Sequence, residues 1–372
     1  MVCFYLKIRY TVVTIQSYFL QKGAFMRYPE FLPENGTIGF IAPSFGCNIE
    51  PYQSAFRNAL KTFQSKGYQT KLGPNCFEGS GIGISNTPEK CAQEFMDAWQ
   101  DKESDILMSC GGGELMCEIL PYVNFMTIKN TPAKWFQGYS DNTNLAFLLA
   151  TICDTAAVYG PCAPAFGMEP WHTSLEDSFS ILTGSSVCDT DSASFTVHGY
   201  DLYEIESLKD EEHPLVPYNV TQPVIRKRFP DENTAFSGRL IGGCLDILCM
   251  LCGTKYDQVK AFNDRYADDG IIWFLEACDL NVLSIRRAVW QLDQAGWFSH
   301  AKGFLIGRPL NGEALFGLDQ YDAVTEVLKK YDVPILMDLD IGHLPPMMPL
   351  IEGSMADVKI AGNDLTIRMD LI

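Results

Sequence analysis

A run of three glycines is the first feature of this sequence that suits catalysis. Gly111, Gly112 and Gly113 lie between an apolar run and a helical pattern. Backbone at such a turn can approach a ligand closely, and its N–H groups can hold an anion or an oxyanion. Glycine-rich turns also serve packing alone. The chain has neither G-x-G-x-x-G nor G-x-x-x-x-G-K-[ST], so dinucleotide and P-loop sites have little support.

Two ionisable residues follow apolar runs in the second half of the chain. Glu276 ends IIWFLE, and His343 follows PILMDLDIG in a proline-rich loop. Side chains at the carboxyl ends of strands gather where α/β proteins bind ligands, and a histidine there suits general base catalysis. A salt bridge between Glu276 and Arg286 or Arg287, and a purely structural histidine, are the alternatives.

Ser140, in the segment GYSDNTN, is the serine that most resembles a nucleophile. The segment lacks the second glycine of the G-x-S-x-G elbow. Asp141 or Asn142 would suit the N-cap of the helix that follows. We therefore interpret this segment as a helix cap.

The 13 cysteines are odd in number and lie mostly in apolar contexts. Cys249 and Cys252 form a CxxC pair inside an apolar helical stretch, whereas zinc ligands of this kind sit on turns. We interpret the cysteines as free core thiols of a reducing compartment, and we predict a cytoplasmic protein without a metal site or cofactor.

Strand and helix patterns alternate from Thr37 to Cys162, which predicts a mostly parallel sheet with helices on both faces. From about Leu182 to Thr234 the chain becomes acidic, with few helical signals. The last residues read as a hairpin that turns at Gly362-Asn363-Asp364. The predicted fold is α/β, with an N-terminal parallel-sheet domain (26–185), a linker and domain edge (186–234), and a smaller C-terminal α+β domain (235–372).

Composition excludes several classes of protein. Hydrophobic residues make up 47% of the 372 residues and charged residues 20%, as in a globular protein. The net charge of −18 makes nucleic acid a poor partner.

The first 25 residues are apolar but are interrupted by Lys7, Arg9 and Lys22. The uncharged run Tyr10–Gln21 is shorter than the roughly 20 residues that a membrane span needs. We expect a start codon assigned too early, with Met26 as the first residue, and a weakly membrane-associating segment is the alternative. No other stretch predicts a span, so we expect no membrane partner.

Several segments, taken in order, resemble one family. They run from about residue 36 to 370 and read IGFIAPS, DILMSCGGG, EILPYVNF, KWFQGYSDNTNL, VYGPC, GRLIGGCLDILCMLCGT, GIIWFLEACDL, QLDQAGWFSHAKGFLIGRP and DIGHLPPMMPLIEG. The chain resembles the LD-carboxypeptidases, which include the microcin C self-immunity peptidases. The resemblance implies a Ser–His–Glu triad between two domains, with Glu276 orienting His343 as the base, a small peptide ligand and a homodimer.

The nucleophile does not follow from this resemblance. Where the family reads roughly G-G-Y-G-S-N-x-L-L-P, this chain reads GGGELMCEILP, one residue longer. Counting from the glycines places the serine position at Leu115, and counting back from Pro121 places it at Met116. Cys117 is a possible substitute, with a pKa lowered at a helix N-terminus, although one helical position turns a side chain by about 100°. Glu114 would oppose an oxyanion held by Gly112 and Gly113 or would bind an amine.

The resemblance implies a hydrolase that acts on murein peptides or a related peptide amide, with its serine missing. The alternative is an inactive family member that binds a peptidoglycan-type or peptide ligand. A third hypothesis is that Glu276 or His343 activates water directly.

Overall fold

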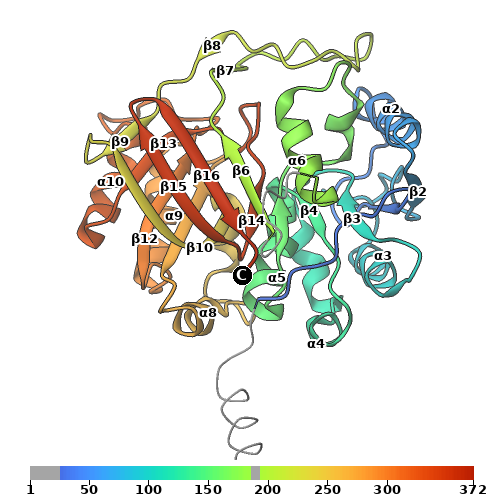
Figure 1. Ribbon diagram of the computed structural model, residues 1–372, viewed down its shortest axis with the longest axis horizontal. Coiled ribbons are helices and arrows are strands. Elements are labelled where there is room, and N and C mark those ends of the chain that lie inside the picture. Colours follow the sequence, from blue (N-terminus) through green and yellow to red (C-terminus); the bar gives the residue numbers. More distant parts are fainter. Residues whose placement is uncertain (1–25, 186–192) are drawn as a thin grey trace, which may run out of the picture.

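The computed structural model describes residues 26–185 and 193–372. They form two packed halves, each built on one sheet. In Figure 1 the N-terminal half, coloured blue to green, lies on the right, and the C-terminal half, coloured orange to red, lies on the left. The predicted origin of residues 1–25 lies outside the described residues and stays a prediction.

The N-terminal sheet has six strands in the order β14-β5-β4-β3-β1-β2, and all are parallel except β14. Its central strands are short apolar runs that are buried on both faces, as parallel strands between helices must be. The strands are β1 (Thr37–Ile41), β2 (Gln69–Leu72), β3 (Ile106–Ser109), β4 (Phe136–Gly138), β5 (Ala157–Tyr159) and β14 (Leu350–Glu352).

Helices cover both faces of this sheet. Helix α2 is amphipathic and buries Ala55, Phe56, Ala59 and Phe63, which share one helical face. Helix α5 is buried almost all round, because it packs against both sheets (Figure 1). The helices of this half are α2 (Tyr52–Ser65), α3 (Pro88–Gln100), η1 (Met116–Tyr122), α4 (Phe125–Asn130), η2 (Ser140–Asn142), α5 (Thr143–Cys153), η3 (Ala163–Gly167) and α6 (Thr173–Thr183).

The C-terminal sheet has eight strands in the order β6-β16-β15-β10-β11-β12-β13-β9. Strands β10 to β13 are parallel, and the strands on either side of them are antiparallel. The strands are β6 (Ser194–His198), β9 (Lys227–Phe229), β10 (Thr234–Cys244), β11 (Ile271–Glu276), β12 (Ala301–Gly307), β13 (Ile335–Leu339), β15 (Met355–Ala361) and β16 (Asp364–Asp370). The predicted hairpin is confirmed by β15 and β16, where Gly362 takes a φ of 59° at the turn.

The remaining elements surround the C-terminal sheet. A separate two-stranded sheet joins β7 and β8. The elements are β7 (Leu202–Tyr203), β8 (Gln222–Pro223), α7 (Leu245–Leu251), α8 (Val259–Arg265), α9 (Val282–Gln294), α10 (Gln320–Leu328) and η4 (Lys329–Tyr331).

The prediction of an α/β fold with a parallel N-terminal sheet and a second sheet is confirmed. The segment 186–234, which we predicted to be a linker and domain edge, supplies the two outer strands of the C-terminal sheet. Strands β6 and β9 lie within residues 186–234 but belong to the C-terminal sheet, and β14 comes from the C-terminal part but pairs with β5 in the N-terminal sheet.

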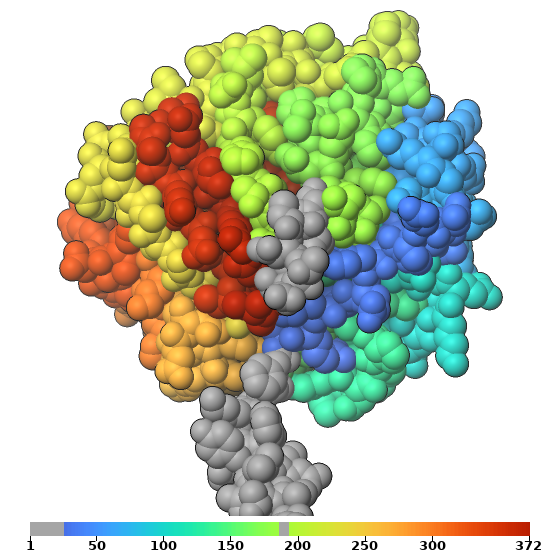
Figure 2. Space-filling model, viewed as in Figure 1, coloured from blue at the N-terminus to red at the C-terminus, as the bar shows by residue number. Residues whose placement is uncertain are grey.

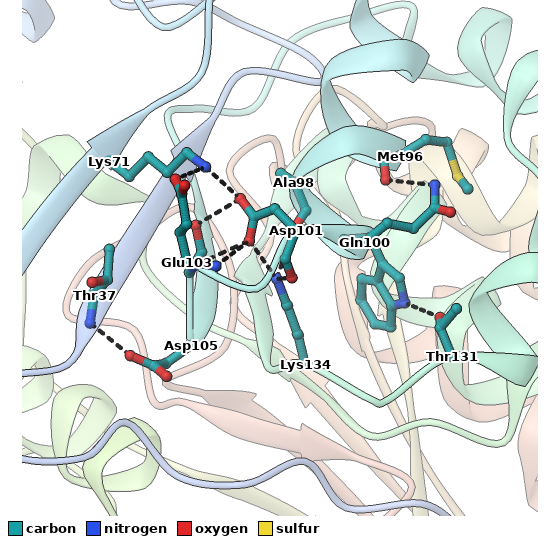
Figure 3. Close-up of polar contacts among 12 residues, drawn as sticks. Thr37, Lys71, Met96, Ala98, Gln100, Asp101, Glu103, Asp105, Thr131 and Lys134 are labelled. Atoms are coloured by element: carbon teal, nitrogen blue, oxygen red, sulfur yellow. Dashed lines mark hydrogen bonds and ion pairs between the residues drawn. The ribbon is translucent and has the colours of Figure 1, made fainter.

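A polar network links strand β2, the end of helix α3 and the segment before strand β4 (Figure 3). Asp101, just after α3, accepts hydrogen bonds from the amines of Lys71 and Lys134, each at 2.8 Å. Partial burial raises the pKa of Asp101, but the two lysines lower it by more, so its carboxylate is stabilised. The network ties α3 to β2 and to the segment that enters β4.

Candidate active site

Ser140 sits on a sharp turn between β4 and the helical segment formed by η2 and α5. Its φ of 61° lies in the left-handed region, which a serine rarely adopts. The side chain is partly exposed, while its neighbours Asp141 and Asn142 are buried. Such a strained strand-to-helix turn is typical of a nucleophile elbow, because it presents one hydroxyl at the edge of the sheet.

The turn at Ser140 has a glycine two positions before the serine, but it has Asn142 where the G-x-S-x-G motif has its second glycine. A Cβ on Gly138 would lie 2.8 Å from the Cβ of Asn142, so the residues two positions before and two positions after Ser140 cannot both carry side chains. Gly138 provides the space, and Asn142 uses it to donate hydrogen bonds to the carbonyls of Gly111 and Tyr139. The missing second glycine of the motif is therefore compatible with an elbow.

The hydroxyl of Ser140 meets an imidazole from the other half of the molecule. Its Oγ lies 3.0 Å from Nε2 of His343, and Nδ1 of His343 lies 2.9 Å from Oε2 of Glu276. A carboxylate only accepts, so Nδ1 carries a proton and donates it to Glu276, which leaves Nε2 of the neutral ring free to accept from Ser140. The three groups form one hydrogen-bonded chain.

Glu276, at the end of β11, forms no ion pair with an arginine of the described residues. Its other oxygen, Oε1, accepts a hydrogen bond of 2.6 Å from the hydroxyl of Tyr159 on β5. Arg286 and Arg287 bond instead to the carbonyl of Asp322 and the hydroxyl of Ser284. The alternative of a Glu276–arginine salt bridge is therefore wrong.

The backbone before His343 brings the imidazole close to Glu276. Gly342 has a φ of 106°, and a Cβ there would lie 2.5 Å from Oε2 of Glu276. The ring of Tyr139 lies 5.1 Å from the imidazole, centroid to centroid, and limits its rotation. These contacts give the base a defined orientation.

Burial and charge act in opposite directions on this pair. Burial lowers the pKa of His343, but the carboxylate of Glu276, together with Cys278, raises it by more, so the net pKa lies above that of an ordinary histidine. Burial likewise raises the pKa of Glu276, while His343 lowers it below its usual value. The pair thus stabilises a protonated imidazole next to a charged carboxylate, which is the arrangement needed once the ring has accepted a proton.

The glycine run lies directly beside Ser140. A Cβ on Gly112 would lie 2.9 Å from Cβ and Oγ of Ser140 and 3.8 Å from the backbone nitrogen of Asp141. Within residues 26–185 and 193–372, the N–H groups of Gly112 and Gly113 have no hydrogen-bond acceptor.

Asp141 ties this turn to the elbow. Its carboxylate accepts from the N–H of Met116 at 2.9 Å, from the hydroxyl of Ser44 at 2.5 Å and from the amide of Asn144 at 3.0 Å. Burial raises the pKa of Asp141 to about 6, and these hydrogen bonds offset part of that rise. The residue after Ser140 therefore fixes the position of the glycine run.

A cavity of about 470 Å³ opens onto these groups. Ser140, His343 and the three glycines line this cavity, together with residues of the segment between β6 and β9. We call residues 199–226 the strap. Figure 1 shows the strap, with β7 and β8, crossing the top of the molecule, and Figure 2 shows its yellow-green atoms covering that edge of both halves.

The assignment of the family's serine position to Leu115 or Met116 stays a prediction. Met116 is fully buried, and neither residue lines the cavity. Cys117 also lies outside the cavity lining, and burial, together with Asp141 and Glu118, raises the pKa of its thiol, which is opposite to the lowered pKa that we expected. A serine that contacts His343 is present, and it comes from a different turn, at Ser140.

The structure bears on two further interpretations. Asn142 is the N-cap residue of α5, as predicted, but neither its side chain nor that of Tyr139 at η2 makes a capping hydrogen bond. Glu114 is exposed and does not line the cavity, and its N–H bonds to the carbonyl of Gly83. The signal for Ser140 was its position after a strand and a glycine, directly before a buried helix.

Comparison with known proteins identifies the family of this chain. The N-terminal domain family of LD-carboxypeptidases matches residues 38–160, and the C-terminal domain family matches residues 237–358. The chain belongs to the LD-carboxypeptidase family. Ser140 falls in the first match, whereas Glu276 and His343 fall in the second.

Individual relatives span nearly the whole chain. The microcin C7 self-immunity protein MccF of Escherichia coli is 27% identical over 335 residues, which are 87% of this chain and 90% of that protein. A solved structure of MccF with glutamyl sulfamoyl guanosine has a TM-score of 0.77 at 22% identity and covers 92% of this chain and 98% of its own. A muramoyltetrapeptide carboxypeptidase from Oxalobacter formigenes has a TM-score of 0.62 at 18% identity, covering 90% and 98%. These structures share the fold of this LD-carboxypeptidase family member.

Within residues 26–185 and 193–372, no helix has the length and apolar character needed to cross a membrane. In the same residues, no three His, Cys, Asp or Glu side chains are arranged to hold a metal ion.

Proposed function

We propose that this protein is an active serine-type hydrolase that cleaves an amide bond in a small peptide or peptide-like substrate. The observation that carries the proposal is the hydrogen-bonded chain from Ser140 through His343 to Glu276 at the floor of a cavity. Membership of the LD-carboxypeptidase family supports it.

The geometry supports the following reaction. The hydroxyl of Ser140 attacks the carbonyl carbon while its proton passes to Nε2 of His343. The imidazolium, stabilised by Glu276, then gives this proton to the leaving nitrogen as the C–N bond breaks. Water hydrolyses the acyl-serine with His343 again as the base, which releases the acid and restores Ser140.

The backbone at the glycine run would stabilise the intermediate. Gly112 is packed against Ser140, and its N–H has no acceptor among the described residues, so it is available to donate to the carbonyl oxygen as that oxygen becomes negative. A donor of this kind contributes on the order of 10²- to 10³-fold to the rate.

The relatives suggest two substrates to test. One is a murein tetrapeptide that loses its terminal D-alanine, as the name of the Oxalobacter formigenes carboxypeptidase suggests. The other is an aminoacyl sulfamoyl nucleoside of the kind bound by MccF. A role in peptidoglycan recycling or in immunity depends on which of them is cleaved. The cytoplasmic location and the homodimer implied by the family resemblance stay predictions.

The test compares two substitutions in the full-length chain. We expect Ser140→Ala to lower kcat by at least about 10³-fold on the substrate that the wild type cleaves, measured by mass spectrometry of the products. Cys117→Ala is the matched control and keeps kcat within about twofold, because Cys117 lies outside the cavity.

Three outcomes would contradict the proposal in different ways. Activity that survives Ser140→Ala but not Cys117→Ala would move the nucleophile to Cys117. Activity that survives both substitutions would favour direct activation of water by Glu276 or His343. Binding of the tetrapeptide without any turnover by the wild type would favour the inactive, ligand-binding alternative.

A further inference from the structure

The strap is anchored to the body of the protein at its two ends. Asp340 is fully buried and accepts from the N–H of Tyr200 at 3.0 Å and from the guanidinium of Arg226 at 2.6 Å. Arg308 pairs with the other oxygen of Asp340 at 2.7 Å. Asp340 lies three residues before His343, so the strap is held close to the catalytic groups.

Two backbone hydrogen bonds hold the middle of the strap. The N–H of Glu204 donates to the carbonyl of Pro345, and the carbonyl of Leu215 accepts from the N–H of Glu169. Between them, residues 205–213 are exposed with one exception, which is Lys209. Its side chain lines the cavity, whereas the acidic residues around it (Glu206, Asp210, Glu211 and Glu212) are exposed and absent from the lining.

Lys209 is the only lysine or arginine among the described residues that line the cavity. Its amine has no hydrogen-bond or ion-pair partner within residues 26–185 and 193–372. Glu204 also lines the cavity, but its carboxylate accepts from the N–H of Asn219 and forms no ion pair with Lys209 in that part of the chain. Burial lowers the pKa of Lys209, and Glu204 offsets part of that change.

An unpaired amine at the wall of a partly apolar cavity favours an anion as its partner. The cavity also presents Phe45, Pro217 and Tyr218, which lower the local dielectric and strengthen a charge pair. The protein as a whole carries a net charge of −18 and repels anions at long range, so an acidic substrate needs a local cation.

We propose that Lys209 is the residue of this chain that pairs with a carboxylate of the substrate, and that this pairing sets a preference for the acid over the matching amide. This inference rests on the proposed function, because it assumes that the cavity at Ser140 is the substrate site. The carboxylate has two sources, the C-terminus of a peptide or an acidic side chain.

Binding to a non-cleaving variant tests the inference without turnover. Two matched ligand pairs are titrated into Ser140→Ala by calorimetry, and each pair exchanges one carboxylate for an amide. The first pair is glutamyl and glutaminyl sulfamoyl adenosine. The second is the tetrapeptide L-Ala-γ-D-Glu-Dap-D-Ala and the same peptide with a C-terminal carboxamide.

We expect Ser140→Ala to bind the acid of one pair about 10- to 100-fold more tightly than the amide, and Lys209→Met in that background to abolish this preference. The pair that responds identifies the carboxylate. Lys209→Arg keeps the charge and is expected to retain most of the preference, and Lys61→Met, on the exposed face of α2, is the control.

Each contrary result has a distinct meaning. Equal weakening of acid and amide by Lys209→Met, or no binding of either acid, would overturn the role of Lys209. A preference that depends on Lys209, combined with a wild type that cleaves neither acid, would support the carboxylate site and refute the proposed hydrolase activity.

Discussion

At the scale of single residues, the Glu276–His343 pair determines how activity should depend on pH. Glu276 is fully buried and Tyr159 donates to one of its oxygens, so its charge acts on His343 with little screening by water. That charge raises the pKa of His343 above its usual value. The base is active when neutral, so kcat/KM should increase as the pH rises towards the pKa of His343.

Replacing Glu276 by glutamine removes the charge and nearly preserves the shape. The pKa of His343 should then fall, and the rising limb of kcat/KM against pH should move to lower pH. The rate itself should drop by about 10²- to 10⁴-fold, because the imidazolium and its tautomer lose their partner. A pH profile of kcat/KM for Glu276→Gln against the wild type measures both effects.

Glu114→Gln is the matched control for this profile, since Glu114 is exposed outside the cavity. Its profile should coincide with that of the wild type. If the rising limb of kcat/KM against pH is unchanged in Glu276→Gln, then Glu276 does not set the pKa of His343. A changed profile in Glu114→Gln would revive the hypothesis that Glu114 binds an amine of the substrate.

The sequence was informative about two of the three groups in the hydrogen-bonded chain. Glu276 ends the apolar strand β11 and His343 follows the apolar strand β13, and the carboxyl ends of parallel strands lie at one edge of the sheet. The contact of Ser140 with His343 could not be predicted from the sequence, because the left-handed φ of Ser140 and its contact with the glycine run depend on tertiary structure. A motif that requires two glycines could not show that Asn142 fits the second position.

At the scale of elements, the site depends on the close contact of two turns. The turn after β3 carries Gly112, the turn after β4 carries Ser140, and the carboxylate of Asp141 holds them together through Met116. There is no room for a methyl group between them, since it would lie 2.9 Å from Ser140.

We therefore expect Gly112→Ala to displace the serine or the N–H donor and to lower kcat by about 10²-fold, with a smaller effect on stability. Gly160→Ala is the control, because its methyl group would meet side chains at 3.2 Å or more. Steady-state kinetics and thermal unfolding of both variants separate the two effects. Unchanged kcat in Gly112→Ala would show that this contact is not part of the catalytic geometry.

Elements with a strong period were predictable, and short ones were not. The apolar positions of α2 and α3 recur at helical spacing, and the buried strands are continuous apolar runs. Strands β7 and β8 have two residues each, and β9 and β14 have three, which is too few to show alternation. The acidic composition of residues 186–234 therefore did not indicate that this segment supplies two strands, β6 and β9, to the C-terminal sheet.

At the scale of the whole molecule, the hydrogen-bonded chain exists only when both sheets are packed together. Ser140 follows β4 of one sheet, whereas Glu276 ends β11 of the other. Tyr159 on β5 spans this boundary, because its hydroxyl donates to Glu276 and accepts from the N–H of Ser140 at 3.3 Å. Strand β14 also joins the two halves, because it belongs to the C-terminal part of the chain but pairs with β5 of the N-terminal sheet.

This interlocking predicts that the two sheets unfold together although the family is described as two domains. Calorimetry of the wild type should show one transition with a calorimetric enthalpy close to the van't Hoff enthalpy. Tyr159→Phe should shift that whole transition to lower temperature, by about 1.5–3 kcal/mol of stability for a lost hydrogen bond to a charged group.

The same substitution should also lower kcat, since both Ser140 and Glu276 lose one positioning contact. Tyr256→Phe is a suitable control because the Tyr256 hydroxyl has no hydrogen-bond partner within the described residues. Two resolved transitions, with only one of them shifted by Tyr159→Phe, would show that the sheets are energetically independent. In that case the packed arrangement of Ser140 against His343 would depend on ligand binding instead of on the fold, and substrate analogues should merge the two transitions into one.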